Sequence, residues 1–290
     1  MKLLLLDVGN SRLKWALLRG RYRRGQPFAA QGAVEIPALR SLAAWSRLFK
    51  GLGAPDVIWA CNVAGVAVER RIRAACQRAG LPAPQFARSQ HAAAGVRNAY
   101  RDTWRLGADR WVGLIGARHE HPGRNLCIVG LGTAMTIDLL DALGRHRGGC
   151  MVPGPRLMIE SLLERTAGIR RRAGGWQAAR SFDRAFGALA VPGQRARSPA
   201  RAATLFARDT HGALVEGSRH ACAALIEHAL SQARTQLGRQ ARLIVAGGAT
   251  DAITPLLKGR FRREDDLVLR GLAVLAADAA APDRITSSRA

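Results

Sequence analysis

The stretch LLLLDVGNSRLKWALLRG, residues 3–20, decides the fold of this chain. A run of leucines ends at Asp7, glycine and asparagine follow at positions 9 and 10, and alternating apolar residues begin again at Leu13. This order predicts a strand, a tight turn and a second strand. A third strand around residues 33–36 would complete an antiparallel meander.

The same pattern returns in CIVGLGTAMTIDLLD, residues 127–141, with a third strand expected at 147–152. Leu6–Ser11 aligns with Val129–Ala134 at an offset of 123 residues. A repeat this long indicates duplicated domains and not a solenoid. We therefore expect an α/β fold with domains at residues 1–122 and 123–290 that face a nucleotide cleft, the layout of the actin/hexokinase-like (ribonuclease H-like) ATPases.

Between the glycine turns, helical and strand-like periodicities alternate along the chain. The spacing predicts strands at 56–63, 85–87 and 243–248, and helices at 39–49, 66–79, 109–119, 155–165, 210–237 and 267–277.

Composition excludes several classes of protein. The formal net charge is +24, and Arg supplies 41 of the 45 basic residues, spread along the chain except for the denser stretch 170–201, which we interpret as a solvated loop rather than a polyanion-binding arm. No apolar run approaches the roughly 20 residues that a membrane helix needs, and no signal segment is recognisable, so we expect a cytoplasmic protein. Five scattered cysteines without a CxxC pair favour neither a disulfide framework nor a zinc site.

The first glycine turn has the residues that a phosphate site needs. Gly9 lets backbone amides approach a phosphate, Asn10 and Ser11 can donate to its oxygens, and Asp7 can bind Mg²⁺ directly or through water. Lys14, on the next strand, can neutralise phosphoryl charge. The alternative is an ordinary hairpin turn with no ligand.

Two later glycine turns favour the phosphate interpretation. Gly132 and Thr133 stand at the duplicated position of the first turn. Gly247 and Gly248 end a predicted buried strand and precede a helix, where small residues leave room for a base or ribose and the helix start favours an anion. An ordinary strand-to-helix turn is the alternative for this last pair.

A polar segment between the halves contains Tyr100, Gly107, Asp109 and Arg110. A carboxylate at a helix start beside a guanidinium can be a simple cap with a salt bridge. Next to a hydroxyl substrate, the same Asp109 can act as a general base.

Taken together and in order, these motifs resemble the type III pantothenate kinases over almost the whole chain. The matching residues are Asp7-x-Gly9-Asn10-Ser11-x-x-Lys14, Gly107-x-Asp109-Arg110, Gly132-Thr133-Ala134-x-Thr136-x-Asp138, Gly148-Gly149-x-x-x-Pro153-Gly154, Asp209-Thr210, Glu216-Gly217 and Gly247-Gly248.

The resemblance implies ATP-dependent phosphorylation of pantothenate to 4'-phosphopantothenate, the first step of coenzyme A biosynthesis. It implies Asp109 as the catalytic base, with Tyr100, Gly107 and Arg110 around pantothenate and Thr210 contributed across a homodimer interface. It also implies Mg²⁺ with ATP, bound through Asp7, and a monovalent cation, K⁺ or NH₄⁺.

One departure concerns the second turn, where the family usually has Asp and this chain has Gly130. This change leaves one carboxylate fewer for a cation, so we expect an altered monovalent-cation requirement. The alternative function is a catalytically weakened relative that acts as a regulatory or nucleic-acid-associated accessory protein. Because no helix-turn-helix, zinc knuckle or RNA-binding aromatic motif is present in the sequence, we expect no specific nucleic-acid partner.

Overall fold

A computed structural model describes residues 1–177, 179–180, 182 and 204–280. The chain forms two compact units, the first made of Met1–Pro122 together with Leu267–Ala290, and the second of Gly123–Asp266. The units separate between residues 122 and 123. The last helix departs from the expectation that 123–290 form one domain, because it belongs to the first unit.

The first unit is built on a five-stranded sheet with the order β3-β2-β1-β4-β5. Strands β1, β2 and β3 are antiparallel, whereas β4 runs parallel to β1 and β5 parallel to β4. Its elements are β1 (Lys2–Val8), β2 (Arg12–Arg19), β3 (Ala30–Glu35), a 3-10 turn (Ile36–Ala38), α1 (Leu42–Gly51), β4 (Val57–Asn62), α2 (Val66–Arg78), β5 (Gln85–Phe86), β6 (Ala92–Ala93), β7 (Val96–Arg97), a second 3-10 turn (Thr103–Arg105), α3 (Ala108–Glu120) and α9 (Leu267–Ala279).

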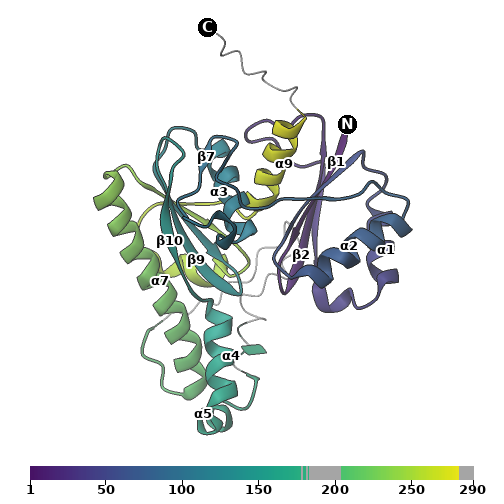
Figure 1. The fold of residues 1–290 in the computed structure, drawn as a ribbon. Helices are drawn as coiled ribbons and strands as arrows, with labels where there is room; N and C mark the ends of the chain where they lie inside the picture. Colours follow the sequence, from purple (N-terminus) through teal and green to yellow (C-terminus); the bar gives the residue numbers. More distant parts are fainter. Residues whose placement is uncertain (178, 181, 183–203, 281–290) are drawn as a thin grey trace. The chain divides into compact units, whose positions relative to one another are not determined.

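Alternation along β1 decides which face of this sheet each side chain reaches. Leu4, Leu6 and Val8 pack in one apolar cluster with residues of α1 and α2, which lie together on one side of the sheet (Figure 1). The intervening Leu3, Leu5 and Asp7 therefore face the other side, where α9 contacts β1 and α3 contacts β4. Asp7 thus points toward the face that α3 covers.

Two glycines allow the close crossing of α3 and α9. A Cβ added to Gly116 of α3 would clash with the carbonyl oxygen of Leu267, and one added to Gly271 of α9 would clash with the carbonyl oxygen of Val112. The two helices therefore pack with their backbones in contact. This explains why the C-terminal helix belongs to the first unit.

The second unit repeats the first sheet, strand for strand, with the order β10-β9-β8-β11-β12. Strands β8, β9 and β10 are antiparallel, and β11 and β12 add in parallel. Its elements are β8 (Leu126–Leu131), β9 (Ala134–Leu140), β10 (His146–Pro153), α4 (Pro155–Arg165), α5 (Ala167–Arg172), α7 (Thr210–Leu237), β11 (Arg242–Ala246), α8 (Thr250–Ile253), a 3-10 turn (Thr254–Leu256) and β12 (Phe261–Arg263).

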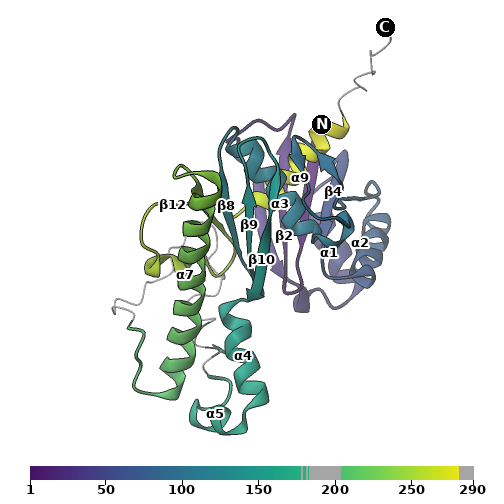
Figure 2. The same cartoon turned by 60° about the vertical axis from the view of Figure 1, so that its left-hand side comes forward.

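Helix α7 is the long helix of this unit. Asp209 is its N-cap residue. The Asp209 side chain accepts a hydrogen bond from the Gly212 amide at 2.7 Å, which stabilises the first turn of the helix. Helix α4 lies beside α7 in both views (Figures 1 and 2), and Ile159 and Leu163 of α4 join Leu214 and α7's other buried residues in one core.

The basic stretch 170–201 differs from the expected loop where it is described. Arg170–Arg172 are exposed, but they belong to α5 and so to a helix. Residues 183–201 lie outside the described part of the chain.

Among the helices of the described residues, none combines the length and hydrophobicity needed to cross a lipid bilayer.

Candidate functional site

The first unit places Asp7 beside a cation and a thiol at the end of β1. Asp7 pairs with Lys14 on the antiparallel β2 and with Cys61 on the parallel β4. The turn that follows is closed by a hydrogen bond from the Gly9 amide to the carbonyl oxygen of Arg12, 3.0 Å long. Asn10 and Ser11 are exposed beyond it, and can face a ligand.

The charges of this cluster act on one another. Burial raises the pKa of Asp7 to about 6, with Lys14 opposing the rise and Asp109 adding to it. Burial, and then the charges of Asp7 and Asp109, raise the pKa of Cys61 well above its usual value. The two carboxylates and the thiol therefore lie close enough to interact, although Asp109 comes from a different element. Sequence reasoning missed Cys61, whose place becomes visible only in the β1–β4 register.

Gly107 leaves the space in which the Asp109 carboxylate lies. A Cβ at Gly107 would be 2.7 Å from Oδ1 of Asp109, which is too close for a side chain to fit without movement. The same oxygen accepts a hydrogen bond from the Arg110 amide at 2.8 Å. The Gly-x-Asp-Arg spacing thus fixes the carboxylate at the first turn of α3, the end of the helix that favours negative charge.

Tyr100 and Arg110 form a pair next to Asp109. The Arg110 guanidinium donates to the Tyr100 hydroxyl at 3.1 Å and lies 5.7 Å from the centre of its ring. The buried Asn98 orients this tyrosine, since its side-chain oxygen accepts from the Tyr100 amide at 2.9 Å while its side-chain nitrogen donates to the Gln90 carbonyl. Sequence reasoning missed Asn98, although an Asn two residues before a placed side chain is a known turn signal.

The second unit brings its glycine turns together. The Gly154 amide donates to the Thr133 carbonyl oxygen at 2.8 Å, and a Cβ at Gly154 would clash with the carbonyl oxygen of Gly132. Gly247 has φ +108°, and a Cβ there would clash with the carbonyl oxygen of Leu131. Backbone packing thus requires glycine at both positions, which leaves the exposed Thr133 and Gly248 at the surface of the turns. Gly154, the last residue of the Gly148–Gly154 motif, therefore lies against the turn of Gly132 and Thr133.

Gly130 occupies the register position of Asp7 in the repeated sheet. It pairs with Thr136 on β9 and with Ala246 on β11, as Asp7 pairs with residues of β2 and β4. The nearest carboxylate on β9, Asp138, is buried and bonded to Nε2 of His146 at 2.9 Å.

Comparison with known proteins agrees with these motifs. A sequence profile described as type III pantothenate kinase matches residues 3–232. The type III pantothenate kinase of Albidiferax ferrireducens is 35% identical over 283 residues, which are 96% of this chain and 98% of that protein. The chain belongs to the type III pantothenate kinase family.

Further relatives support this membership. The type III pantothenate kinase of Burkholderia thailandensis is 39% identical over 94% of this chain and 97% of its own. The crystal structure of the ethanolamine utilization protein EutJ from Carboxydothermus hydrogenoformans is similar with a TM-score of 0.50 and 10% identity, over 95% of this chain and 90% of that one. At that identity the likeness concerns the fold alone. The actin/hexokinase-like fold expected for a pantothenate kinase is confirmed.

The residues expected at the family's site are divided between the units. Asp7, Lys14, Tyr100, Gly107, Asp109 and Arg110 lie in the first, and Gly132, Thr133, Gly247, Gly248 and Thr210 in the second. Thr210 is the first residue of α7 and is partly exposed. Nothing contradicts the assigned residues, and their individual roles stay predictions.

Within the described residues, no group of three or more His, Cys, Asp or Glu side chains could hold a metal ion.

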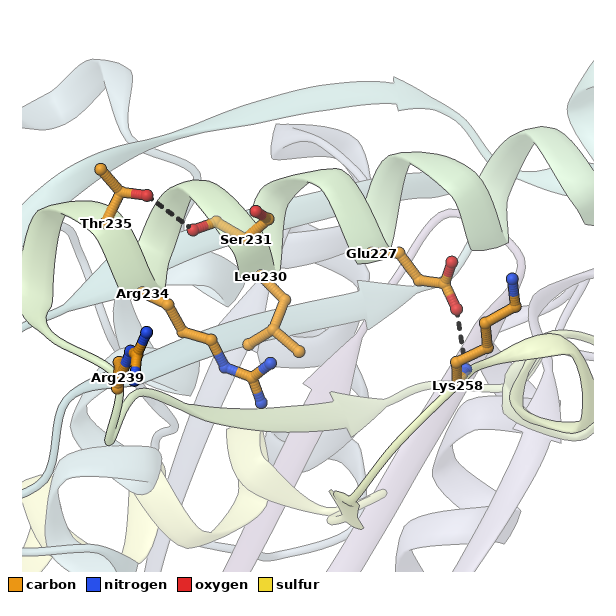
Figure 3. Close-up of a pocket in the computed structure, with 7 residues that line it drawn as sticks. All are labelled: Glu227, Leu230, Ser231, Arg234, Thr235, Arg239 and Lys258. Carbon is orange, nitrogen blue, oxygen red and sulfur yellow. Dashed lines mark hydrogen bonds between the residues drawn. The ribbon is translucent and has the colours of Figure 1, made fainter.

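A hollow of about 420 Å³ opens elsewhere in the second unit, against the C-terminal half of α7 (Figure 3). Arg239 and Lys258 precede the parallel strands β11 and β12, whereas Gly247 follows β11, so this hollow lies at the opposite edge of the sheet from the glycine turns. Its charges have structural roles: Arg234 lies in the last turn of α7, where a cation is favourable, and the Glu227 carboxylate accepts from the Lys258 amide at 2.7 Å. We assign this hollow no part in the kinase site.

Proposed function

We propose that this protein transfers the γ-phosphoryl group of ATP to the terminal hydroxyl of pantothenate with Asp109 as the catalytic base. Membership of the family supports the reaction. The observation that supports the base is the position of the Asp109 carboxylate, which the missing side chain of Gly107 accommodates and the Arg110 amide fixes.

The pantothenate oxygen forms a bond to the γ-phosphorus, the bond from that phosphorus to the β–γ bridging oxygen breaks, and ADP leaves. The hydroxyl proton passes to a carboxylate oxygen of Asp109. Because phosphoryl transfer depends mainly on positioning and charge, Tyr100 and Arg110 contribute by orienting the substrate, and Lys14 by stabilising phosphoryl charge.

Asp7 and the glycine turns would bind the nucleotide and its Mg²⁺. Mg²⁺ keeps several waters and takes one or two carboxylates together with substrate phosphates, and Asp7 offers such a carboxylate at the phosphate turn. When bound, the ion would neutralise charge on the phosphates. We include K⁺ or NH₄⁺ as a weaker requirement, since Gly130 supplies no carboxylate at the second turn.

Replacing the proposed base tests this function. Asp109→Asn should retain ATP binding but lose roughly 10²-fold or more in kcat, because the amide cannot accept the hydroxyl proton. Asp102→Asn is the matched control, since this exposed carboxylate in the same segment pairs with Arg105 at the surface. Near-normal turnover by a folded Asp109→Asn protein would remove Asp109 from the role.

We also propose a homodimer in which Thr210 completes the partner's pantothenate site. The apolar residues near the start of α7 give little support for an interface, because Leu214 and Val215 pack in the unit's own core. Support comes instead from Leu205 and Phe206, which stand just before Thr210 and are 47% and 83% exposed.

Mixing two inactive variants tests the shared site. In a mixed dimer of Asp109→Asn and Thr210→Ala chains, one site would combine an intact Asp109 with an intact Thr210 from the partner. Activity should therefore return on mixing, and sedimentation should show a dimer at assay concentration. An active monomer, or no recovery in proven mixed dimers, would contradict the shared site.

A further inference from the structure

The loop between β2 and β3 displays four arginines around one hollow. Arg19, Arg21, Arg23 and Arg24, together with Gly20, Gly25 and Gln26, line a cavity of about 530 Å³. All four side chains are exposed, and none of them makes an ion pair with another residue in the ranges that the structure describes. The hollow therefore concentrates positive charge that other side chains leave uncompensated.

Hydrogen bonds to Glu120 of α3 and Arg270 of α9 hold this loop in place. The hydroxyl of Tyr22, a residue only 6% exposed, donates to Glu120 at 2.6 Å and accepts from Arg270 at 2.8 Å. The second carboxylate oxygen of Glu120 accepts from the Gly25 amide at 3.0 Å. Burial and the hydrogen bond to Glu120 raise the pKa of Tyr22, so it remains a neutral donor over the physiological range.

Aromatic contacts add to the anchor. The Tyr22 ring stacks on Phe28 at 6.3 Å and lies 5.4 Å from the ring of His119. At the base of the loop, the Gly20 amide donates to the Met1 carbonyl oxygen at 2.9 Å, and within it the Arg23 amide donates to the Gln26 side chain at 3.0 Å. The loop is consequently tied at both ends and in its middle, which preorganises the arginines that surround the hollow.

The position of the hollow separates it from the proposed kinase site. The loop meets the start of β1 at Met1, whereas Asp7 is near the other end of that strand. Six residues of extended chain span about 20 Å. A ligand in the hollow would therefore not contact the phosphate turn of its own unit.

From this arrangement we propose that the β2–β3 loop, Arg19–Gln26, is a binding site for a small anion that carries two or more phosphate groups. Guanidinium groups match phosphate oxygens with paired hydrogen bonds, and several of them around one hollow suit several phosphates. The volume lies within the range of small-molecule sites. Exposed like charges repel only weakly in water, so the four arginines alone do not require a ligand. This loop differs from the other exposed arginines of the chain because its backbone is held in place by the hydrogen bonds described above.

Titration calorimetry with tripolyphosphate tests the proposal on the full-length protein. Arg21→Gln/Arg23→Gln/Arg24→Gln should lose one equivalent of binding, or at least roughly ten-fold in affinity, since several charge-assisted hydrogen bonds disappear. Its kcat with ATP and pantothenate should be unchanged, because none of the three residues belongs to the kinase site. The control Arg234→Gln/Arg239→Gln/Lys258→Gln removes the same charge from the other hollow and should bind like the natural protein (Figure 3).

A second variant tests the anchor without changing charge. Tyr22→Phe keeps the ring but removes the hydroxyl bonded to Glu120 and Arg270, and should weaken tripolyphosphate binding several-fold. Equal losses in the loop variant and its control, or unchanged binding in Tyr22→Phe, would overturn the proposal in favour of diffuse attraction. A single-stranded oligonucleotide that displaces tripolyphosphate at a lower phosphate concentration, in a manner dependent on the loop arginines, would also overturn it and assign the loop to nucleic acid.

Discussion

At the scale of single residues, the fold makes the charge of the Asp7 carboxylate costly. Asp7 is the only ionisable residue of β1 beyond Lys2, and it interrupts a run of buried leucines. Its burial near Asp109 disfavours the charged form, whereas the Mg²⁺ site proposed above needs that charge. Such a conflict between stability and function is expected at active sites, and it can be measured.

Replacing Asp7 by Asn should stabilise the protein at high pH. A carboxyl group whose pKa is raised in the folded state makes folding more favourable below its unfolded pKa, and this contribution is lost as pH rises through about 6. Asn resembles the neutral form at every pH. Asp7→Asn should therefore increase the free energy of unfolding by about 2–3 kcal/mol at pH 8 and by little at pH 4.

Urea denaturation between pH 4 and pH 8 measures this difference. Asp102→Asn is again the control, because its exposed pair with Arg105 contributes little at any pH. The prediction fails if Asp7→Asn raises the free energy of unfolding equally at every pH, or lowers it at pH 8. Either result would show that ionisation of Asp7 does not destabilise the folded protein. Activity should fall in the same variant, since it lacks the carboxylate that we propose as the Mg²⁺ ligand.

At the scale of elements, the close crossing of α3 and α9 requires glycine at the points where the two backbones meet. Gly116→Ala would push a methyl group into the carbonyl oxygen of Leu267, so the helices must separate, at a cost of about 2–4 kcal/mol. Gly113→Ala, one turn earlier on α3, meets no atom within 4 Å and should stabilise the helix by about 0.5–1 kcal/mol. Thermal unfolding of the two variants compares them directly, and equal effects would contradict the close crossing.

Periodicity predicted most elements well and a few not at all. The helices at 66–78, 155–165 and 210–237 lie within a residue of their expected bounds, because apolar residues recur along them at helical spacing. The three-residue strand β12 was missed, since FRR has no alternation to read. Periodicity also could not tell which sheet α9 would pack against. That depends on Gly116 contacting the carbonyl of Leu267 and Gly271 contacting the carbonyl of Val112, and these residues are far apart in the sequence.

The site was predictable where a motif carried its own chemistry. Asp7, Asp109 and the turn glycines could be named from spacing, and the structure gives Gly107 a steric reason for its place. Cys61 could not, because its proximity to Asp7 arises from the register of two parallel strands. Asn98 acts through hydrogen bonds that no pattern of apolar residues reveals.

At the scale of the whole molecule, duplication gives both units the same sheet and lets their turns diverge. The first unit keeps a carboxylate near the end of β1, a cation near the start of β2 and a thiol near the end of β4. The second keeps glycine, threonine and alanine at the corresponding places. One sheet is thereby suited to charge and proton chemistry, and the other to the close approach of backbone to a nucleotide.

Gly130 makes that divergence testable. An added Cβ would lie 2.8 Å from Oγ1 of Thr136, so Gly130→Asp requires only that a threonine side chain turn, while Asp138 is engaged by His146 and does not replace the missing charge. A new carboxylate supplies an oxygen ligand for a cation, so the half-activating concentration of K⁺ or NH₄⁺ should fall roughly ten-fold in Gly130→Asp relative to the natural protein. Gly130→Asn, of equal size but neutral, should not show this gain. The measurement is kcat as a function of K⁺ and NH₄⁺ concentration for the three proteins. The same strong activation in all of them would mean that Gly130 does not govern cation binding at the second turn.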